Sequence, residues 1–269
     1  MTSKVAHLAE RRVRYLDSGG GRALVLLHAF PLSADQWLPQ VLRAPPGWRV
    51  IAPDLRGFRN STLAQAESLP ARVTMEVYAA DVFALMDHLE IRDACVAGVS
   101  MGGYIAFAMV QQAPQRVTGL VLAHTRATPD TPEGRTNRDK MIDLVKRDGA
   151  ESVARAMLPK LLGETAWREQ PDLVDAVGQM IRANTPEAIA GALGALRDRP
   201  DRTPLLKSIS CPTLIIAGEE DTIIPRTDAG AMHEGIGQSQ LVVLPRAGHL
   251  GNLEAPAAFN EAMYGFLTD

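Results

Sequence analysis

Short apolar runs alternate along the chain with longer segments that have helical periodicity. Residues 23–28 read ALVLLH between Gly-rich and turn-forming sequence, which is typical of a strand buried on both faces of a parallel sheet. Similar runs occur at residues 48–54, 94–100, 116–124, 213–221 and 240–245, and helical spacing occurs at residues 75–91, 102–112 and 256–269. This alternation predicts an α/β fold, with a mostly parallel central sheet and helices on both faces.

One long interval breaks the alternation. Residues 125–207 contain several helix-like pieces, among them NRDKMIDLVKRDG and DLVDAVGQMIRAN, but no convincing strand. The interval begins at the predicted carboxyl end of a strand, where ligands bind in open α/β sheets. We therefore predict a helical cap at residues 125–207, inserted into a core made of residues 1–124 and 208–269. The alternative is that these helices only thicken one face of the sheet.

Composition and charge narrow the possible partners. The chain has 269 residues, 46% of them hydrophobic, and a formal net charge of −3, so one sizeable core is expected. Acidic and basic residues are mixed, with no basic stripe for nucleic acid and no polybasic membrane anchor. No apolar run has the length of a signal peptide's core at the N-terminus or of a membrane span elsewhere, so we expect a cytoplasmic protein. Cys95 and Cys211 adjoin apolar runs and are expected to be small buried hydrophobes.

A glycine-flanked serine lies where an apolar run meets a helical segment. Residues 97–103 read AGVSMGG and put Ser100 in a G-x-S-x-G pattern. In a nucleophile elbow the serine occupies a sharp, strained turn, and small neighbours let strand and helix approach closely. The N-terminus of the following helix also favours a developing oxyanion. An ordinary strand-to-helix turn can carry the same pattern, but the context favours a nucleophile at Ser100.

A serine nucleophile needs a general base, and the base needs a carboxylate that orients it. In folds with this elbow the order along the chain is serine, acid, histidine. Asp221 follows the apolar run TLIIAG and His249 follows QLVVLP. Both are at predicted carboxyl ends of strands, at the same edge of the sheet as Ser100. Glu219 and Glu220 are the competing acids, and we expect both to be solvated loop carboxylates.

His124 is the main alternative to His249 as the base, because it also ends an apolar run. It precedes the predicted cap, however, and so breaks the expected order of serine, acid and histidine. We otherwise expect His124 to line the pocket. His7, His88 and His233 are expected to be solvated surface residues.

An oxyanion site needs backbone N–H donors. The N–H of Met101 is the natural first donor, since it directly follows the serine. A second donor is expected in the loop after an early strand, here His-Ala-Phe-Pro at residues 28–31. Pro31 has no N–H, so Ala29 and Phe30 remain, and we favour Phe30. The alternative is a packing turn in which Phe30 only covers the core.

Taken together, these segments resemble the α/β-hydrolase superfamily of esterases, haloperoxidase-like perhydrolases, enol-lactonases and related carboxylesterases, over nearly the full length. LLHAFPLSADQW is similar to the family's oxyanion loop, AGVSMGG to its elbow, AGEEDTIIP to its acid loop and AGHLGNLEAP to its histidine loop. APDLRGFRNS is similar to a segment in which Asp54 and Arg56 would be structural. The family's Gly-x-x-Asp-x-x-x-Pro spacing selects Asp221 as the acid. The resemblance also implies that Phe30 and Met101 are the oxyanion donors.

The chain departs from the family pattern at two positions. Ala29 stands where glycine is usual, which narrows the conformations open to the oxyanion loop. Arg59 also stands where glycine is usual, and we expect this to matter only to a surface turn.

The resemblance implies a serine hydrolase that cleaves a small or medium carboxylic ester through an acyl-enzyme, with no cofactor and no metal. The same triad could serve a lactonase, a carbon–carbon hydrolase or a perhydrolase. A ligand receptor on the same fold is the alternative of another class. An interfacial lipase is less expected, because residues 125–207 are rich in Arg, Asp and Glu. The sequence sets neither the physiological substrate nor the oligomeric state.

Overall fold

The computed structural model describes residues 1–8, 11–59, 61 and 73–268. Within them, one eight-stranded sheet has the order β1-β2-β4-β3-β5-β6-β7-β8. The strands are β1 (Thr2–Leu8), β2 (Arg11–Asp17), β3 (Arg22–Leu27), β4 (Trp48–Pro53), β5 (Ala94–Val99), β6 (Val117–Ala123), β7 (Thr213–Gly218) and β8 (Ser239–Leu244). From β4 to β8 all neighbours are parallel, whereas β1 and β2 pair antiparallel. The predicted α/β fold class is confirmed.

The two antiparallel strands were not anticipated from the sequence. β1 and β2 carry charged residues and alternate between exposed and buried positions, with Val13 and Tyr15 pointing into the core. Such a half-buried strand lacks the continuous apolar run that marks the strands of the parallel part. By contrast, every residue of the central strand β5 is buried, and β3 is buried continuously from Leu24 to Leu27.

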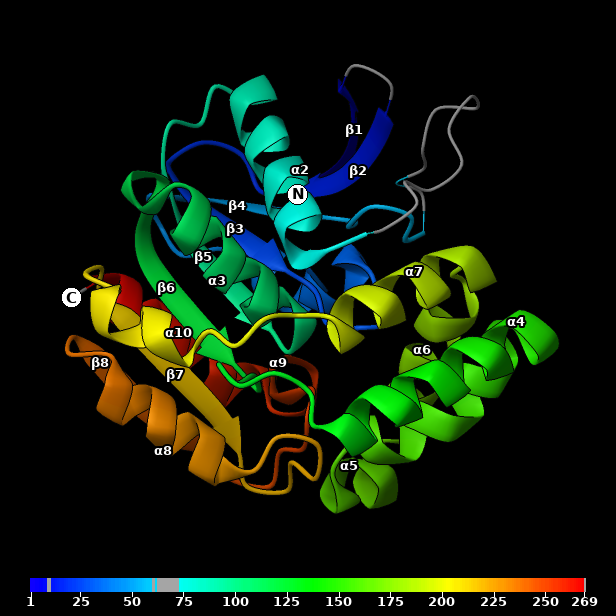
Figure 1. Cartoon of the computed structure of the whole chain (residues 1–269). Coiled ribbons are helices and arrows are strands. Elements are labelled where there is room, and N and C mark those ends of the chain that lie inside the picture. The colour runs from blue at the N-terminus through cyan, green and yellow to red at the C-terminus, as the bar shows by residue number, and fades with distance from the viewer. Residues whose placement is uncertain (9–10, 60, 62–72, 269) are drawn as a thin grey trace.

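Helices cover both faces of the sheet, as predicted. The helices outside residues 125–207 are α1 (Leu38–Val41), α2 (Met75–His88), α3 (Met101–Gln112), α8 (Arg226–Gly235), α9 (Gly251–Glu254) and α10 (Pro256–Thr268), with short 3-10 turns η1 (Ala34–Trp37) and η2 (Pro114–Arg116). Figure 1 shows α2, α3 and α8 in front of the sheet and α10 behind it. The core lies between these layers, and Trp37, Phe107 and Phe259 are among its largest fully buried side chains.

A group of four helices, which we call the helical insertion, follows β6 and precedes β7. It consists of α4 (Pro132–Leu161), α5 (Glu164–Glu169), α6 (Pro171–Arg182) and α7 (Pro186–Arg197), and the 3-10 turn η3 (Thr203–Ser208) leads back to the sheet. All of residues 125–207 are described, and they contain no strand. Figure 1 places the insertion beyond the carboxyl ends of β6 and β7.

Local sequence explains how the insertion's helices begin and bend. The Thr131 hydroxyl accepts a hydrogen bond from the N–H of Gly134 at the start of α4, and Thr185 caps α7 in the same way. Both helices then have proline in the first turn, where its missing N–H costs nothing. α4 is kinked at Gly149, which has a φ of 74° that glycine adopts easily.

Three histidines and both cysteines lie outside the candidate site. His7, His88 and His233 are exposed, as predicted. Cys95 is buried and Cys211 is partly buried, and both are free thiols. Among the described helices, none combines the length and apolar character needed to cross a bilayer.

Candidate active site

Ser100 occupies a sharp turn between β5 and α3. Its backbone is left-handed, with φ 53° and ψ −110°, a conformation that a non-glycine residue rarely adopts. The Ser100 N–H donates to the carbonyl of Ala123 over 2.9 Å, which ties the turn to the neighbouring strand β6. A Cβ atom at Gly98 would lie 2.2 Å from the carbonyl carbon of Gly102, and one at Gly102 would lie 2.1 Å from the carbonyl oxygen of Leu27. The predicted glycines are therefore needed for close packing at the elbow.

The first turn of α3 begins immediately after Ser100. Met101 is the first residue of this helix and is fully buried. N–H groups in the first turn of a helix have no partner within the helix, and they lie at the positive end of its dipole. This is the chemical environment that an oxyanion donor at Met101 requires.

Hydrogen bonding in the loop after β3 distinguishes Ala29 from Phe30 as the second oxyanion donor. The N–H of Ala29 donates to Gln36 Oε1 over 2.7 Å, so that group is already engaged. Gln36 is itself held by Asn252, whose Oδ1 accepts from Gln36 Nε2 over 3.0 Å. Because Pro31 has no N–H, this arrangement favours Phe30 as the donor.

The buried side chain of His28 binds the backbone of the same loop. Its Nδ1 lies 2.9 Å from the carbonyl oxygen of Ala29, and its Nε2 accepts from the N–H of Leu55 over 3.0 Å. These contacts require a neutral ring that carries its proton on Nδ1. Complete burial lowers the pKa of His28 to about 4, so the neutral form persists at neutral pH. The sequence pattern does not indicate this role, because Leu55 is distant from His28 in the chain.

Asp221 lies just beyond the carboxyl end of β7, as predicted. Its Oδ1 accepts hydrogen bonds from the N–H groups of Ile223 and Ile224, over 2.9 and 3.0 Å. A Cβ atom at Gly218 would lie 2.3 Å from the carbonyl oxygen of Gly248. The acid loop therefore packs directly on the histidine loop, and the backbone amides fix the plane of the carboxylate.

The structure brings His249 and Asp221 together. His249 Nδ1 lies 2.9 Å from Asp221 Oδ2 and 3.1 Å from Oδ1. The side chains of His249 and Asp221 are only 2% and 1% exposed. Burial by itself would raise the pKa of Asp221, but His249 and His124 more than offset this and hold it far below its usual range. Asp221 is therefore an ionised acceptor that fixes the His249 proton on Nδ1 and leaves Nε2 available.

The two neighbouring glutamates have different surroundings. Glu219 is exposed, and its Oε2 accepts from the N–H of Arg246 over 3.2 Å. Glu220 is half-buried and accepts from both the N–H and the hydroxyl of Thr165, over 2.8 and 2.6 Å. The expectation that both are solvated is therefore wrong for Glu220, because α5 of the helical insertion packs against it.

His124 has a place that the sequence did not predict. Its Nδ1 lies 3.2 Å from Asp221 Oδ2, so Asp221 contacts two imidazole rings. The side chain is 0% exposed, and its ring centroid lies 6.0 Å from that of His249. The ring is therefore buried against the acid instead of lining an open pocket.

Glu254 joins the histidine loop to the helical insertion. Its carboxylate accepts from the N–H groups of Gly248 and Leu250, which flank His249, and from that of Gly163, over 2.7 to 2.9 Å. Burial raises the pKa of Glu254, although these three N–H groups lower it in part. One buried side chain thus sets the position of His249 and of the junction between α4 and α5.

Asn184, between α6 and α7, makes a second link, on the oxyanion side. Its Nδ2 donates to the carbonyl of Pro31 over 2.8 Å, and its Oδ1 accepts from the N–H of Arg59 over 2.9 Å. Arg59 has a φ of 50°, which explains why glycine suits this position. The expectation that Arg59 matters only to a surface turn is wrong, since its backbone binds the insertion.

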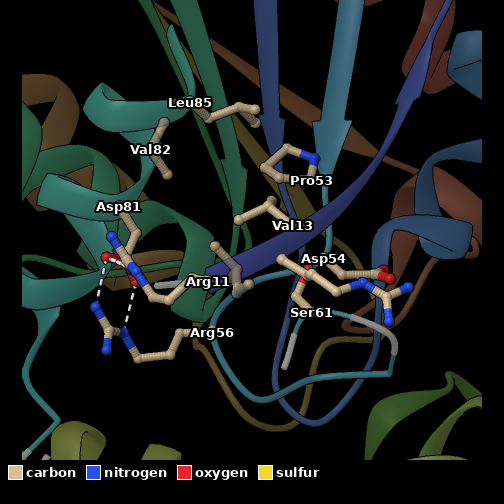
Figure 2. A pocket seen from close by; sticks show the side chains of 11 residues that line it. Arg11, Val13, Pro53, Asp54, Arg56, Ser61, Asp81, Val82 and Leu85 are labelled. Atoms are coloured by element: carbon tan, nitrogen blue, oxygen red, sulfur yellow. Dashed lines mark hydrogen bonds and ion pairs between the residues drawn. The ribbon is translucent and has the colours of Figure 1, made fainter. Parts of the chain in front are cut away.

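Asp54 and Arg56 hold the polypeptide that leads away from β4. Asp54 accepts from the N–H of Ala34 over 2.8 Å. Arg56 makes two hydrogen bonds of 2.6 Å to Asp81 of α2, and Arg11 of β2 binds the same carboxylate (Figure 2). These residues line a cavity of about 20 Å³ whose described walls contain no member of the candidate triad. Their contacts are those of a structural ion-pair cluster.

One group of side chains has the composition of a metal site. His124, Asp221 and His249 each place a donor atom within 4.8 Å of the others. Both imidazole Nδ1 atoms are engaged by the carboxylate, and hydrogen bonding between a base and its acid accounts for the spacing.

Known proteins are similar to this chain in sequence. The model of the alpha/beta hydrolase fold family matches residues 22–256. 3-Oxoadipate enol-lactonase 2 of Acinetobacter baylyi is 29% identical over 241 residues, which make up 90% of this chain and 86% of that protein. AB hydrolase superfamily protein YisY of Bacillus subtilis is 31% identical over 262 residues, 93% of each protein.

Solved structures of an esterase and an enol-lactonase are also similar to this chain. A thermophilic esterase from Thermogutta terrifontis, with malate bound, has a TM-score of 0.92 and 37% identity, covering 100% of this chain and 98% of that one. The enol-lactonase from Burkholderia xenovorans LB400 has a TM-score of 0.89 and 25% identity, covering 99% and 100%. Because the family model spans most of the sequence, this chain belongs to the α/β-hydrolase family.

Proposed function

We propose that this hydrolase cleaves a carboxylic ester of a small or medium substrate through a covalent acyl-enzyme. The single observation that carries the proposal is the buried, ionised Asp221 bound to His249 Nδ1 at 2.9 Å. This pair lies at the carboxyl edge of the sheet, where Ser100 occupies a strained elbow. A nucleophile, a base and an orienting acid are the three components that acyl transfer requires.

In this mechanism Ser100 Oγ attacks the ester carbonyl while His249 Nε2 accepts the serine proton. Asp221 keeps the proton of the neutral ring on Nδ1 and stabilises the imidazolium that forms. His249 then protonates the leaving alcohol, which departs and leaves Ser100 acylated. Water, deprotonated by the same imidazole, attacks the acyl-enzyme and releases the acid. Protonation of His249 before the reaction blocks the first step, so activity falls on the acid side.

The N–H groups of Phe30 and Met101 would stabilise the oxyanion of both tetrahedral intermediates. Two observations support this assignment: Ala29 is engaged by Gln36, and Met101 opens a helix directly after Ser100. Donors fixed in advance stabilise the transition state without reorganising during the reaction. We further propose that the helical insertion acts as a cap that selects substrates, since it begins at the carboxyl end of β6.

A fluorophosphonate probe tests the nucleophile directly. Such reagents form a tetrahedral adduct only with an activated serine. We expect mass spectrometry to locate the adduct on Ser100 and expect no labelling of Ser100→Ala. The control is Ser61→Ala, which removes a buried serine outside the candidate triad and should leave labelling of Ser100 intact. An adduct at another residue, or equal labelling of Ser100→Ala, would contradict the proposal.

Lactone opening is the second candidate, because an enol-lactonase is among both the relatives and the similar structures. The same residues would open the ring, and the leaving alkoxide would stay attached to the acyl group. Aryl esters graded by acyl length, assayed beside simple lactones and enol-lactones, distinguish the two. Higher kcat/KM for esters supports an esterase, whereas turnover of lactones alone would overturn the ester assignment.

A further inference from the structure

The backbone at the end of β6 connects the nucleophile to the acid. The N–H of His124 donates to the carbonyl of Ile216 in β7 over 2.8 Å, and the next residue, Thr125, donates its hydroxyl to the carbonyl of Ser100 over 2.9 Å. His124 itself has a φ of 50°, in the left-handed region where asparagine, aspartate and histidine are over-represented. This turn directs the imidazole into the space beside Asp221.

The contacts of His124 determine where its ring carries a proton. Asp221 is ionised and can only accept, so the Nδ1 atom 3.2 Å from its Oδ2 must donate. His124 Nε2 is buried and has no hydrogen-bond partner among the described residues. A Cβ atom at Gly251 would lie only 2.5 Å from Nε2, so the chain closes tightly over this atom. A proton on Nε2 would be an unsatisfied buried donor, and the neutral ring with its proton on Nδ1 is favoured.

The carboxylate of Asp221 therefore has a full set of donors. Two backbone amides bind Oδ1, and His249 and His124 share Oδ2. Each donor draws on the same negative charge. A hydrogen bond from the neutral His124 ring leaves less of that charge to stabilise the imidazolium of His249, while it prevents the carboxylate from turning away from His249.

Other ionisable groups near these rings are also engaged. Glu254 is engaged by three backbone N–H groups, those of Gly163, Gly248 and Leu250. Glu220 accepts from Thr165 on the acid loop's outer side. Replacing His124 leaves these contacts in place, so its effect on Asp221 and His249 can be measured separately.

We propose that His124 is a positioning residue for the hydrolytic reaction: its Nδ1–H acts with the backbone amides of the acid loop to hold Asp221 in the plane that binds His249, and it moderates the basicity of His249. The inference rests on the proposed function of Ser100, His249 and Asp221. His124 does not touch the substrate, and it acts only through the acid.

Two substitutions separate the hydrogen bond from the volume of the ring. His124→Asn keeps an N–H donor near the position of Nδ1, and asparagine tolerates the left-handed backbone. His124→Leu keeps much of the volume and removes the donor, and thermal melting reports the backbone strain that leucine adds at a φ of 50°. We expect His124→Leu to lower kcat by about 10-fold with little change in KM, as for the loss of a hydrogen bond to a charged group. We expect His124→Asn to retain most of the wild-type kcat.

The pH profile gives a readout that a purely structural role would not move. Without the His124 donor, Asp221 offers more charge to His249, so the acid limb of kcat/KM should move to higher pH in His124→Leu, by about half a unit. His124→Asn should leave the limb in place. Equal losses in both variants, or an unmoved acid limb in folded His124→Leu, would overturn the proposal. If His124→Leu does not fold, the profile of His124→Asn decides, because a moved limb there contradicts the role of the donor.

Imidazole ¹⁵N spectra test the contact without reference to activity. Comparing wild type with His124→Asn assigns the His124 nitrogens, and we expect a protonated Nδ1 and an unprotonated Nε2. A proton on Nε2 instead would refute the inference even in an active enzyme. Absence of Ser100 labelling in the wild type would count against the proposed function, whereas the spectra would still report on the contact between His124 and Asp221.

Discussion

The acid–histidine side and the oxyanion side of the site are supported in different ways. On the acid–histidine side, buried carboxylates organise the loops: Asp221 binds two imidazoles and two amides, and Glu254 binds the backbone on both sides of His249. On the oxyanion side, neutral groups do this work, with His28 and Gln36 holding the loop from the core. A carboxylate therefore binds the backbone on both sides of His249, whereas the hydrogen bonds to Ala29 come from neutral side chains.

The helical insertion contacts both sides, again by different means. Gly163 and Thr165 bind the carboxylates of Glu254 and Glu220, whereas Asn184 binds backbone groups at Pro31 and Arg59. A charged acceptor binds an N–H group more strongly than a neutral one does. We therefore expect changes on the acid–histidine side to affect the chemical step most, and changes at the insertion to affect the shape of the pocket.

The largest effect is expected at the acid. Asp221→Asn should lower kcat by as much as about 10⁴-fold with a far smaller change in KM, because the amide no longer fixes the His249 tautomer or stabilises the imidazolium. Steady-state kinetics on an aryl ester measure this. Glu219→Gln is the matched control on the same loop, and it should change kcat little. A loss in folded Glu219→Gln equal to that in Asp221→Asn would move the acid to another residue.

On the oxyanion side, the buried and neutral His28 should make the stability of the protein depend on pH. His28 has a pKa of about 4 in the fold, lowered by burial, against about 6.5 for a free histidine. Between these two pKa values the unfolded chain binds more protons than the folded chain does, so the free energy of unfolding falls as the pH falls. The contribution of His28 to stability is present above about pH 6.5 and is lost as the pH falls toward 4. The loss is at most about 1.4 kcal/mol per pH unit.

Urea unfolding at several pH values tests this linkage. His28→Gln replaces the ring with a group that does not titrate, and the pH dependence of its free energy of unfolding should be shallower in that window. His88→Gln is the control, because His88 is exposed. Identical slopes for wild type and His28→Gln would show that His28 does not contribute.

A smaller effect is expected where the insertion contacts the oxyanion loop. Asn184→Ala removes the donor to Pro31 and the acceptor for Arg59, so kcat should fall by roughly 10-fold, as for one or two neutral hydrogen bonds. Thermal melting checks the fold in parallel. Gln179→Ala, at an exposed position of α6, is the control. Full activity in Asn184→Ala would show that the contacts of the insertion do not support the oxyanion loop.

The smallest effect is expected from the apolar lining of the insertion. Met157 of α4 is partly buried and packs against the core. Met157→Ala should change the relative kcat/KM of ester substrates by about 5-fold, at the low end of the roughly 1–3 kcal/mol that one methylene in a pocket is worth. The kcat for the shortest acyl chain should stay close to wild type. Leu161→Ala should have a similar effect. If substitutions throughout α4–α7 left the order of substrate preference unchanged, the substrate pocket would have to be formed by other elements.

The missed features share a physical cause. β1 and β2 were missed because their charged, alternating sequences resemble a solvated terminus until β2 pairs with β4. Glu220 and Asn184 look like ordinary loop polar residues, and their partners Thr165, Pro31 and Arg59 are distant in sequence. Long-range contacts of this kind leave no periodic pattern along the chain that could predict them.

Local sequence patterns were enough to predict the parallel strands, the elbow at Ser100 and the positions of Asp221 and His249 at strand ends. Each of these features depends on residues that are close together in the chain. The two imidazole partners of Asp221, by contrast, depend on long-range packing. His124 and His249 are 125 residues apart in number, and they meet because β6, β7 and β8 are neighbours in the sheet. Sheet order brings their carboxyl ends together, and that order is set by packing of the whole core.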